Sequence, residues 1–216
     1  MVEAGVSRLP VVVIHGALRS QAGLWPIVWF LRRQGFDARA FGYATRRERL
    51  AQHGERLEGF IAGWLKGQVP GLGILTHSMG GLVARAYLAR PGAQAQSRRQ
   101  RVVMLAPPNQ GAALAARMRG FRPFHWLYGA AAEELQPERA AGLGAPPASA
   151  ELLILAGGRH GSEVGYSRRI PGNNDGLVGV AETALPGVTP EFVGGVHSTL
   201  QWRPTVLRRA AEFLAG

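Results

Sequence analysis

Short apolar runs recur along the chain and predict the strands of a buried sheet. Most are continuous rather than alternating, and they are bounded by Gly, Pro or polar residues, which is typical of strands covered on both faces. The predicted strands span residues 9–15, 36–43, 73–77, 101–106, 151–156 and 191–196. Because burial on both faces is characteristic of parallel sheets, we expect these strands to run parallel.

Between these runs, hydrophobic residues recur at helical spacing. In the longest such segment Leu50, Leu57 and Ile61 fall on one stripe. The predicted helices span residues 22–34, 46–66, 82–88 and 203–214, and residues 91–100 are expected to form a polar loop. Strands that alternate with helices predict a single α/β domain over residues 1–216, with about six parallel strands and helices on both faces of the sheet.

Residues 112–150 break this alternation. They hold aromatic and apolar side chains in a stretch interrupted by Gly and Pro, which is too hydrophobic for a plain linker. One interpretation is a small cap or lid that supplies the wall of an acyl-binding pocket. The other is a pair of ordinary helices packed on the sheet, and the sequence favours neither.

The predicted strand at 73–77 leads straight into Ser78 and then into a helix. A residue at so sharp a turn is held in a strained backbone conformation that projects its side chain from the sheet edge, and small residues must flank it. Gly80 and Gly81 meet this need on the helix side, whereas Thr76 stands where the pattern G-x-S-x-G has its first glycine. A serine that caps a helix after a buried strand would look similar, so this stretch alone leaves both interpretations open.

Other polar groups also follow predicted strands. His15-Gly16 ends the first strand, Asp175 lies in a turn after the fifth, and His197 directly follows the last. The carboxyl ends of parallel strands meet at one edge of a sheet, so these groups are expected to gather near Ser78. A serine becomes a nucleophile when a histidine takes its proton and a carboxylate orients that histidine.

Several competing assignments are weaker. We expect His15 to be a buried structural histidine, and the side chain of His77 to point away from Ser78 in a supporting role. Asp175 could belong to an ordinary Asp-Gly turn, in which case Glu163 or Glu182 would be a fallback acid.

Composition and net charge bear on the partners and the location of the protein. The 216 residues are 46% hydrophobic and 18% charged, contain no cysteine and carry a formal net charge of +11. Lys66 is the only lysine, and the arginines are scattered in short groups without interleaved aromatic residues, so we expect no nucleic-acid partner. Weak association with an anionic membrane surface is a minor hypothesis. The first ten residues hold no apolar leader core, which predicts a cytoplasmic location.

The run His77-Ser78-Met79-Gly80-Gly81, preceded by His15-Gly16 and followed in order by Asp175 and His197, resembles the α/β-hydrolases and most of all their small bacterial lipases and esterases. The resemblance covers nearly the whole chain and implies a minimal α/β-hydrolase without the usual first two strands. It implies Ser78 as nucleophile, His197 as base and Asp175 as its partner. The backbone N–H groups of Ala17 and Met79 would form the oxyanion hole.

The same resemblance implies hydrolysis of carboxylic esters, lipid-like or of short to medium acyl length, through an acyl-enzyme on Ser78 and without a cofactor or metal. We expect apolar residues near the site to line the substrate pocket: Leu18, Phe121, Phe124, Trp126 and Leu177. An acyltransferase or thioesterase would use the same triad, and a non-catalytic lipid-binding protein could share the fold. The sequence does not decide the oligomeric state.

Overall fold

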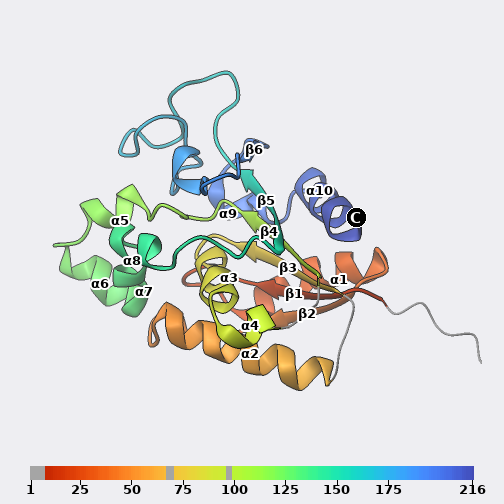
Figure 1. Cartoon of the computed structure of the whole chain (residues 1–216). Helices are drawn as coiled ribbons and strands as arrows, with labels where there is room; N and C mark the ends of the chain where they lie inside the picture. The colour runs from red at the N-terminus through yellow and green to blue at the C-terminus, as the bar shows by residue number, and fades with distance from the viewer. Residues whose placement is uncertain (1–7, 67–70, 96–98) are drawn as a thin grey trace, which may run out of the picture.

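The computed structural model describes residues 8–66, 71–95 and 99–216 (Figure 1). Residues 1–7, which carry most of the argument about a leader, and residues 96–98 of the expected loop lie outside the described residues. The described part forms one six-stranded sheet with the order β2-β1-β3-β4-β5-β6, and every pair of neighbours is parallel. The predicted sheet is therefore confirmed. Its strands are β1 Pro10–Ile14, β2 Asp37–Phe41, β3 Gly71–His77, β4 Arg99–Leu105, β5 Ala150–Ala156 and β6 Glu191–Phe192.

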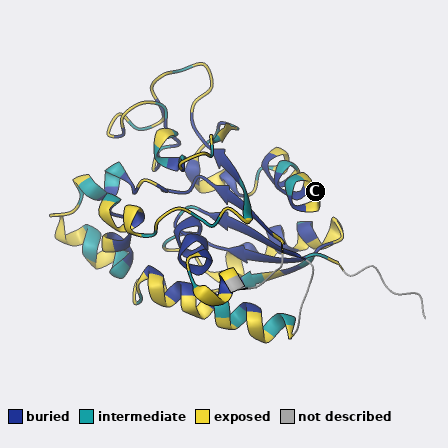
Figure 2. Ribbon diagram, in the orientation of Figure 1, coloured by how far each residue is buried: buried dark blue, intermediate teal, exposed yellow. Residues whose placement is uncertain are grey.

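Helices cover both faces of the sheet, as predicted. Strand β1 shows why its apolar run is unbroken: Val12 and Ile14 pack with α2 (Leu50–Leu65) and α3 (Gly80–Leu88), whereas Val11 and Val13 pack with α1 (Trp25–Arg33) and α10 (Pro204–Ala215). Figure 2 shows the sheet as the most buried layer, with exposed residues on the outer side of the helices. Two hydrophobic cores therefore hold one sheet between them.

Some predicted boundaries are wrong. The helix expected over 46–66 begins only at Leu50, because Arg49 is extended and its N–H donates to the Gln52 side chain at 3.0 Å. The helix expected over 22–34 opens with a 3₁₀ turn, η1 (Gln21–Leu24), before α1. The expected loop at 91–100 instead contains helix α4 (Pro91–Ala95), and β4 already starts at Arg99.

The last strand is much shorter than predicted. Strand β6 ends at Phe192, and the chain then passes through Gly194 and Gly195 with φ values of 63° and 100°. These left-handed conformations, which glycine adopts easily, turn the chain out of the sheet and towards α9 (His197–Leu200). His197 therefore stands at the start of a short helix.

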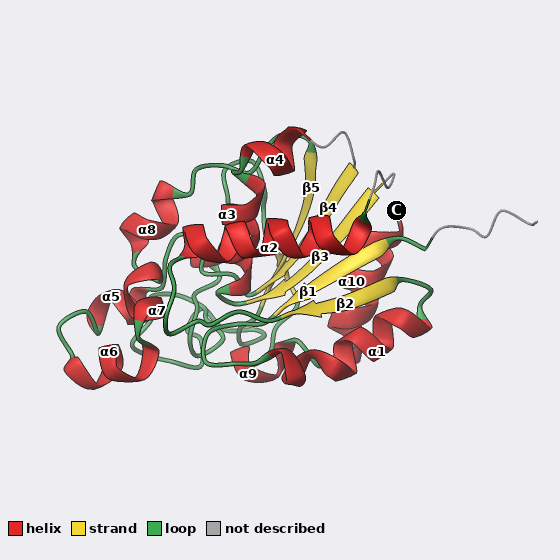
Figure 3. Ribbon diagram, turned by 90° about the horizontal axis from the view of Figure 1, so that it is seen from below, coloured by secondary structure: helices red, strands yellow, loops and turns green. Residues whose placement is uncertain are grey.

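Four short helices occupy the segment that sequence interpretation left open. They are α5 (Ala113–Arg117), α6 (Arg122–Tyr128), α7 (Ala130–Glu134) and α8 (Pro137–Gly142). Figure 3 shows this group beyond the carboxyl ends of the strands rather than along a face of the sheet. A further 3₁₀ turn, η2 (Ala181–Thr183), precedes β6. Within the described residues, no helix combines the length and the apolar character needed to cross a bilayer.

Candidate active site

Ser78 occupies the turn between β3 and α3 with a φ of 54°. This conformation is uncommon for a residue other than glycine, and it is held here because the Ser78 N–H donates to the Leu105 carbonyl at 2.8 Å. A Cβ at Gly80 would lie 2.7 Å from the His15 carbonyl oxygen, and one at Gly81 would lie 2.7 Å from Pro107. Both positions therefore require glycine, as the sequence suggested.

Thr76 fits the position that usually holds a glycine. Its side chain is 1% exposed, and its hydroxyl donates to the Val103 carbonyl of the adjacent strand at 3.3 Å. The hydroxyl is thus satisfied inside the sheet, so the threonine does not disturb the turn.

Asp175 and His197 form a buried pair. His197 Nδ1 lies 2.6 Å from Asp175 Oδ2, and the two side chains are 6% and 1% exposed. The other carboxylate oxygen accepts the N–H groups of Leu177 at 3.0 Å and Val178 at 2.8 Å. Because a carboxylate only accepts hydrogen bonds, Nδ1 carries the hydrogen in this contact, and Nε2 is the ring nitrogen that Asp175 leaves without a partner.

The long loop before Asp175 is held by a residue that sequence interpretation missed. Asn174 is fully buried, and its amide donates to the carbonyls of Ser167, Ile170 and Gly172. Its side-chain oxygen accepts the N–H groups of Ser167 and Gly176. The Asn174 side chain thus holds the loop together through these hydrogen bonds. The loop in turn places Asp175 in contact with His197. An asparagine next to the acid is the signal that could have indicated this role.

Two backbone N–H groups near Ser78 are free. In the described part of the chain, no acceptor lies within hydrogen-bonding distance of the N–H of Ala17 or of Met79. Ala17 follows Gly16, where a Cβ would lie 3.0 Å from Ser78 Cβ, so the two turns are in close contact. Unpaired N–H groups beside a nucleophile can stabilise a developing oxyanion.

His77 contacts His197 through its ring and through a hydrogen bond. Its ring lies 4.8 Å from that of His197, and its Nε2 donates to the His197 carbonyl at 3.0 Å. Burial lowers the pKa of His77 to about 3, so the ring is neutral at physiological pH. His15 is also buried, and its ring stacks on Tyr43 at 4.3 Å. Both arrangements fit supporting rather than catalytic roles.

The two fallback acids lie elsewhere. Glu163 is exposed, and the carboxylate of Glu182 accepts the N–H groups of Ala113 at 2.6 Å and Gly179 at 2.7 Å. Burial raises the pKa of Glu182. Glu182 therefore ties the start of α5 to the turn that follows Asp175.

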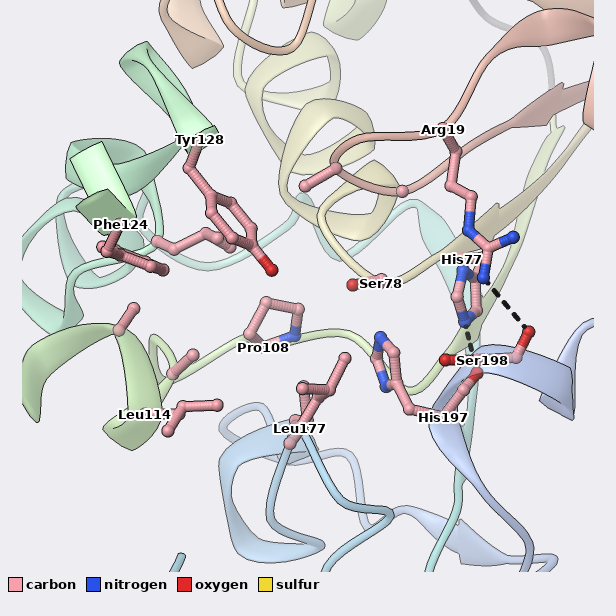
Figure 4. Close-up of a pocket in the computed structure, with 16 residues that line it drawn as sticks. Arg19, His77, Ser78, Pro108, Leu114, Phe124, Tyr128, Leu177, His197 and Ser198 are labelled. Carbon is pink, nitrogen blue, oxygen red and sulfur yellow. Dashed lines mark hydrogen bonds between the residues drawn. The ribbon is translucent and has the colours of Figure 1, made fainter. Parts of the chain in front are cut away.

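Ser78 and His197 face one cavity of about 100 Å³ (Figure 4). In that view Ser78 lies between an apolar side and a charged side of the cavity. One side is apolar and comes mainly from α5 and α6, including Leu114, Phe124 and Tyr128. The other side holds the guanidinium of Arg19, next to the histidines. The cavity thus has an apolar end and a charged end.

A family model described as alpha/beta hydrolase fold matches residues 10–175. The chain belongs to this family. A search of curated proteins found no match. The chain is also similar in fold to solved structures that share low sequence identity with it.

Three of these structures are informative. A lipase of Bacillus licheniformis in mature form is 18% identical, with a TM-score of 0.71 over 95% of this chain and 93% of its own. An esterase of Pyrococcus furiosus is 21% identical, with a TM-score of 0.60 over 97% and 83%. The NocB thioesterase domain is 17% identical, with a TM-score of 0.55 over 95% and 92%. At these identities the likeness concerns the fold.

Some of the predicted pocket residues of this α/β-hydrolase line the cavity, and others do not. Phe124 and Leu177 line the cavity. Leu18 lies in an adjoining hollow, and Phe121 and Trp126 lie outside the cavity lining with exposed fractions of 51% and 77%. Placing Phe121 and Trp126 in the pocket was therefore wrong, because Phe121, just before α6, and Trp126, within it, expose their side chains to solvent instead.

Several lining residues were not anticipated. They are Arg19, Pro108, Ala112, Leu114, Ala115, Tyr128, Leu135, Val178 and Ser198. Pro108 belongs to the turn after β4, and most of the apolar ones lie in 112–150, where the sequence already suggested a pocket wall. No sequence pattern indicated that Arg19 or Ser198 would line the cavity. They do so because they lie close along the chain to Ala17 and His197, which also line it.

Proposed function

We propose that this protein hydrolyses carboxylic esters through an acyl-enzyme on Ser78. The observation that carries the proposal is the buried Asp175–His197 pair at 2.6 Å, whose histidine lines the same cavity as Ser78 with its left-handed backbone. Asp175 keeps the hydrogen of His197 on Nδ1, so that Nε2 takes the proton of Ser78. The serine oxygen attacks the ester carbonyl, and the N–H groups of Ala17 and Met79 bind the oxygen that becomes negative.

His197 then gives its proton to the departing alcohol. A water molecule enters, loses a proton to the same nitrogen and attacks the acyl-enzyme, which releases the acid and restores Ser78. The catalytic chemistry uses side-chain and backbone groups already present at this site. The neutral His77 holds the backbone of His197 in place during these transfers.

The apolar end of the cavity suits the acyl chain. At about 100 Å³ the cavity is small beside the roughly 300–1,000 Å³ of pockets for drug-sized ligands. We therefore infer short acyl groups, with α5, α6 and Leu135 after α7 as the acyl-binding wall.

The test is hydrolysis of p-nitrophenyl esters of graded chain length by the wild type, Ser78→Ala and the control Ser149→Ala, an exposed serine outside the cavity lining. We expect turnover that is highest for short chains, and a loss of about 10⁴-fold or more in Ser78→Ala alone. Full activity in Ser78→Ala would exclude the mechanism.

Transfer to another acceptor is the alternative for the same site. The fold likeness to a thioesterase domain favours testing thioesters beside oxygen esters. Added alcohols or thiols distinguish a hydrolase, which releases free acid, from an acyltransferase, which forms a new ester. A non-catalytic lipid-binding protein would leave Ser78 unlabelled by an active-site fluorophosphonate.

A further inference from the structure

A second, open hollow adjoins the catalytic cavity on the side of the loops after β1 and β2. It measures about 710 Å³ and is lined by Arg19, Arg46 and Arg47 together with Leu18, Tyr43 and Leu127. Arg19 also lines the catalytic cavity, so the two spaces share this side chain. Three positive charges therefore line a hollow that shares Arg19 with the cavity of Ser78.

These arginines are not neutralised by the protein. Among the described residues, no carboxylate lies within salt-bridge distance of Arg19, Arg46 or Arg47. The nearest acid along the chain is Glu48, which pairs with Arg56 and faces His53. Other arginines of this chain, such as Arg90 and Arg119, do have carboxylate partners.

Two of the three guanidinium groups are held by the fold. Arg46 Nη2 donates to the Trp126 carbonyl at 2.7 Å, and its guanidinium lies 6.0 Å from the Trp126 ring. Arg19 Nη2 donates to the Ser198 carbonyl at 3.4 Å, and its guanidinium lies 5.3 Å from the Trp202 ring. A guanidinium has five N–H donors, so most of them stay available to a ligand in a fixed orientation.

The overall arginine excess does not explain this arrangement. The chain has 25 basic and 14 acidic residues, so an arginine without a carboxylate partner is not in itself unusual. Arg208, exposed on α10, likewise has no carboxylate within salt-bridge distance in the part of the chain that the structure describes. What sets Arg19, Arg46 and Arg47 apart is that they line one hollow, and that this hollow meets the catalytic cavity at its charged end.

We propose that this hollow binds a phosphate group on the leaving alcohol, so that the preferred substrates are short acyl esters of phosphorylated alcohols. The inference rests on the proposed function. Several guanidinium groups match the charge and the oxygen atoms of a phosphate monoester better than those of a neutral alcohol. The acyl chain lies against the apolar wall and Ser78 attacks the carbonyl. The bond to the alcohol oxygen breaks, His197 protonates that oxygen, and the phosphorylated alcohol leaves past Arg19.

The experiment compares kcat/KM for hexanoyl glycerol phosphate and hexanoyl glycerol, both as monomers below the concentration at which micelles form. We expect the wild type to prefer the phosphorylated ester by about tenfold or more, and this preference to shrink as salt is added. The double variant Arg46→Gln/Arg47→Gln should lose most of the preference. Arg208→Gln, which removes one positive charge outside the hollow, should keep it.

Each outcome decides a separate question. Equal turnover of both esters by the wild type overturns the phosphate subsite and leaves the proposed function intact. A preference that appears only with anionic vesicles, and not with monomers, also overturns the subsite in favour of attraction to a membrane surface.

If neither ester is turned over and a fluorophosphonate does not label Ser78, the proposed function fails. The subsite is then tested by calorimetric titration with glycerol 3-phosphate. Weaker binding in Arg46→Gln/Arg47→Gln than in Arg208→Gln supports it, and equal or absent binding excludes it.

Discussion

His197 and His77 have rings only 4.8 Å apart, yet the groups around the two rings differ. His197 has a carboxylate on one ring nitrogen and the cavity on the other side. His77 donates to a backbone carbonyl, and burial lowers its pKa to about 3. Burial without a charged partner therefore yields a neutral structural histidine, whereas His197 has the buried carboxylate that the proposed base requires.

A second structural region repeats the pattern of His77. His15 stacks on Tyr43 at 4.3 Å, and His53 lies edge-on to the same ring at 4.6 Å. Burial lowers the pKa of His15, and lowers that of His53 to about 4. The Tyr43 hydroxyl donates to the His15 carbonyl at 2.8 Å. This aromatic stack thus fixes the strand that precedes Gly16 and Ala17.

The largest effect is expected when the carboxylate that sets His197 apart is neutralised. Asp175→Asn keeps the size of the side chain, and its oxygen can still accept the N–H groups of Leu177 and Val178. The amide then faces Nδ1 as a donor and reverses the tautomer, so Nε2 carries the hydrogen and cannot act as a base. We expect kcat for a p-nitrophenyl ester to fall about 10⁴-fold. A loss below tenfold would mean that Asp175 has no role in orienting the base.

The next prediction concerns stability in the aromatic stack. Because the pKa of His53 in the folded protein is about 4, below the roughly 6.5 of an unfolded histidine, the unfolded state binds the extra proton between these values. The contribution of the neutral His53 to the free energy of unfolding is therefore fully present above pH 6.5. It is lost as the pH falls towards 4, and the loss from this site is roughly 3 kcal/mol. His53→Phe should reduce the slope of unfolding free energy against pH in this window, while His15 and His77, whose pKa values are also lowered, maintain part of it. The exposed His160→Gln is the control, and a wild-type slope in His53→Phe would contradict the assignment.

Much of the fold could be predicted because continuous burial leaves a continuous apolar run. The runs around Val12 and Ile74 are unbroken because both faces of the sheet are covered. The end of β6 was harder, since two glycines redirect the chain by their backbone conformation rather than by their polarity. The residues Ser78, Asp175 and His197 could be proposed from their order and their places after strands.

The pocket was predicted less well because its lining depends on packing between short helices. Phe124 and Trp126 are two residues apart on α6, and only Phe124 faces the cavity. Too few turns exist in α6 for a helical stripe to indicate which side is covered. Arg19 and Arg46 likewise come from separate loops, and their proximity arises only when the sheet is assembled.

The smallest effect is expected at His77, where the comparison with His197 is most direct. His77→Leu removes the hydrogen bond to the His197 carbonyl and leaves a buried acceptor unpaired, so we expect kcat to fall by about tenfold with little change in KM. His77→Gln places an amide N–H near the position of Nε2 and should restore most of the activity. Equal losses in both variants would mean that the hydrogen bond does not position the base. A loss of thermal stability in His77→Leu with unchanged kcat would reduce the role of His77 to packing.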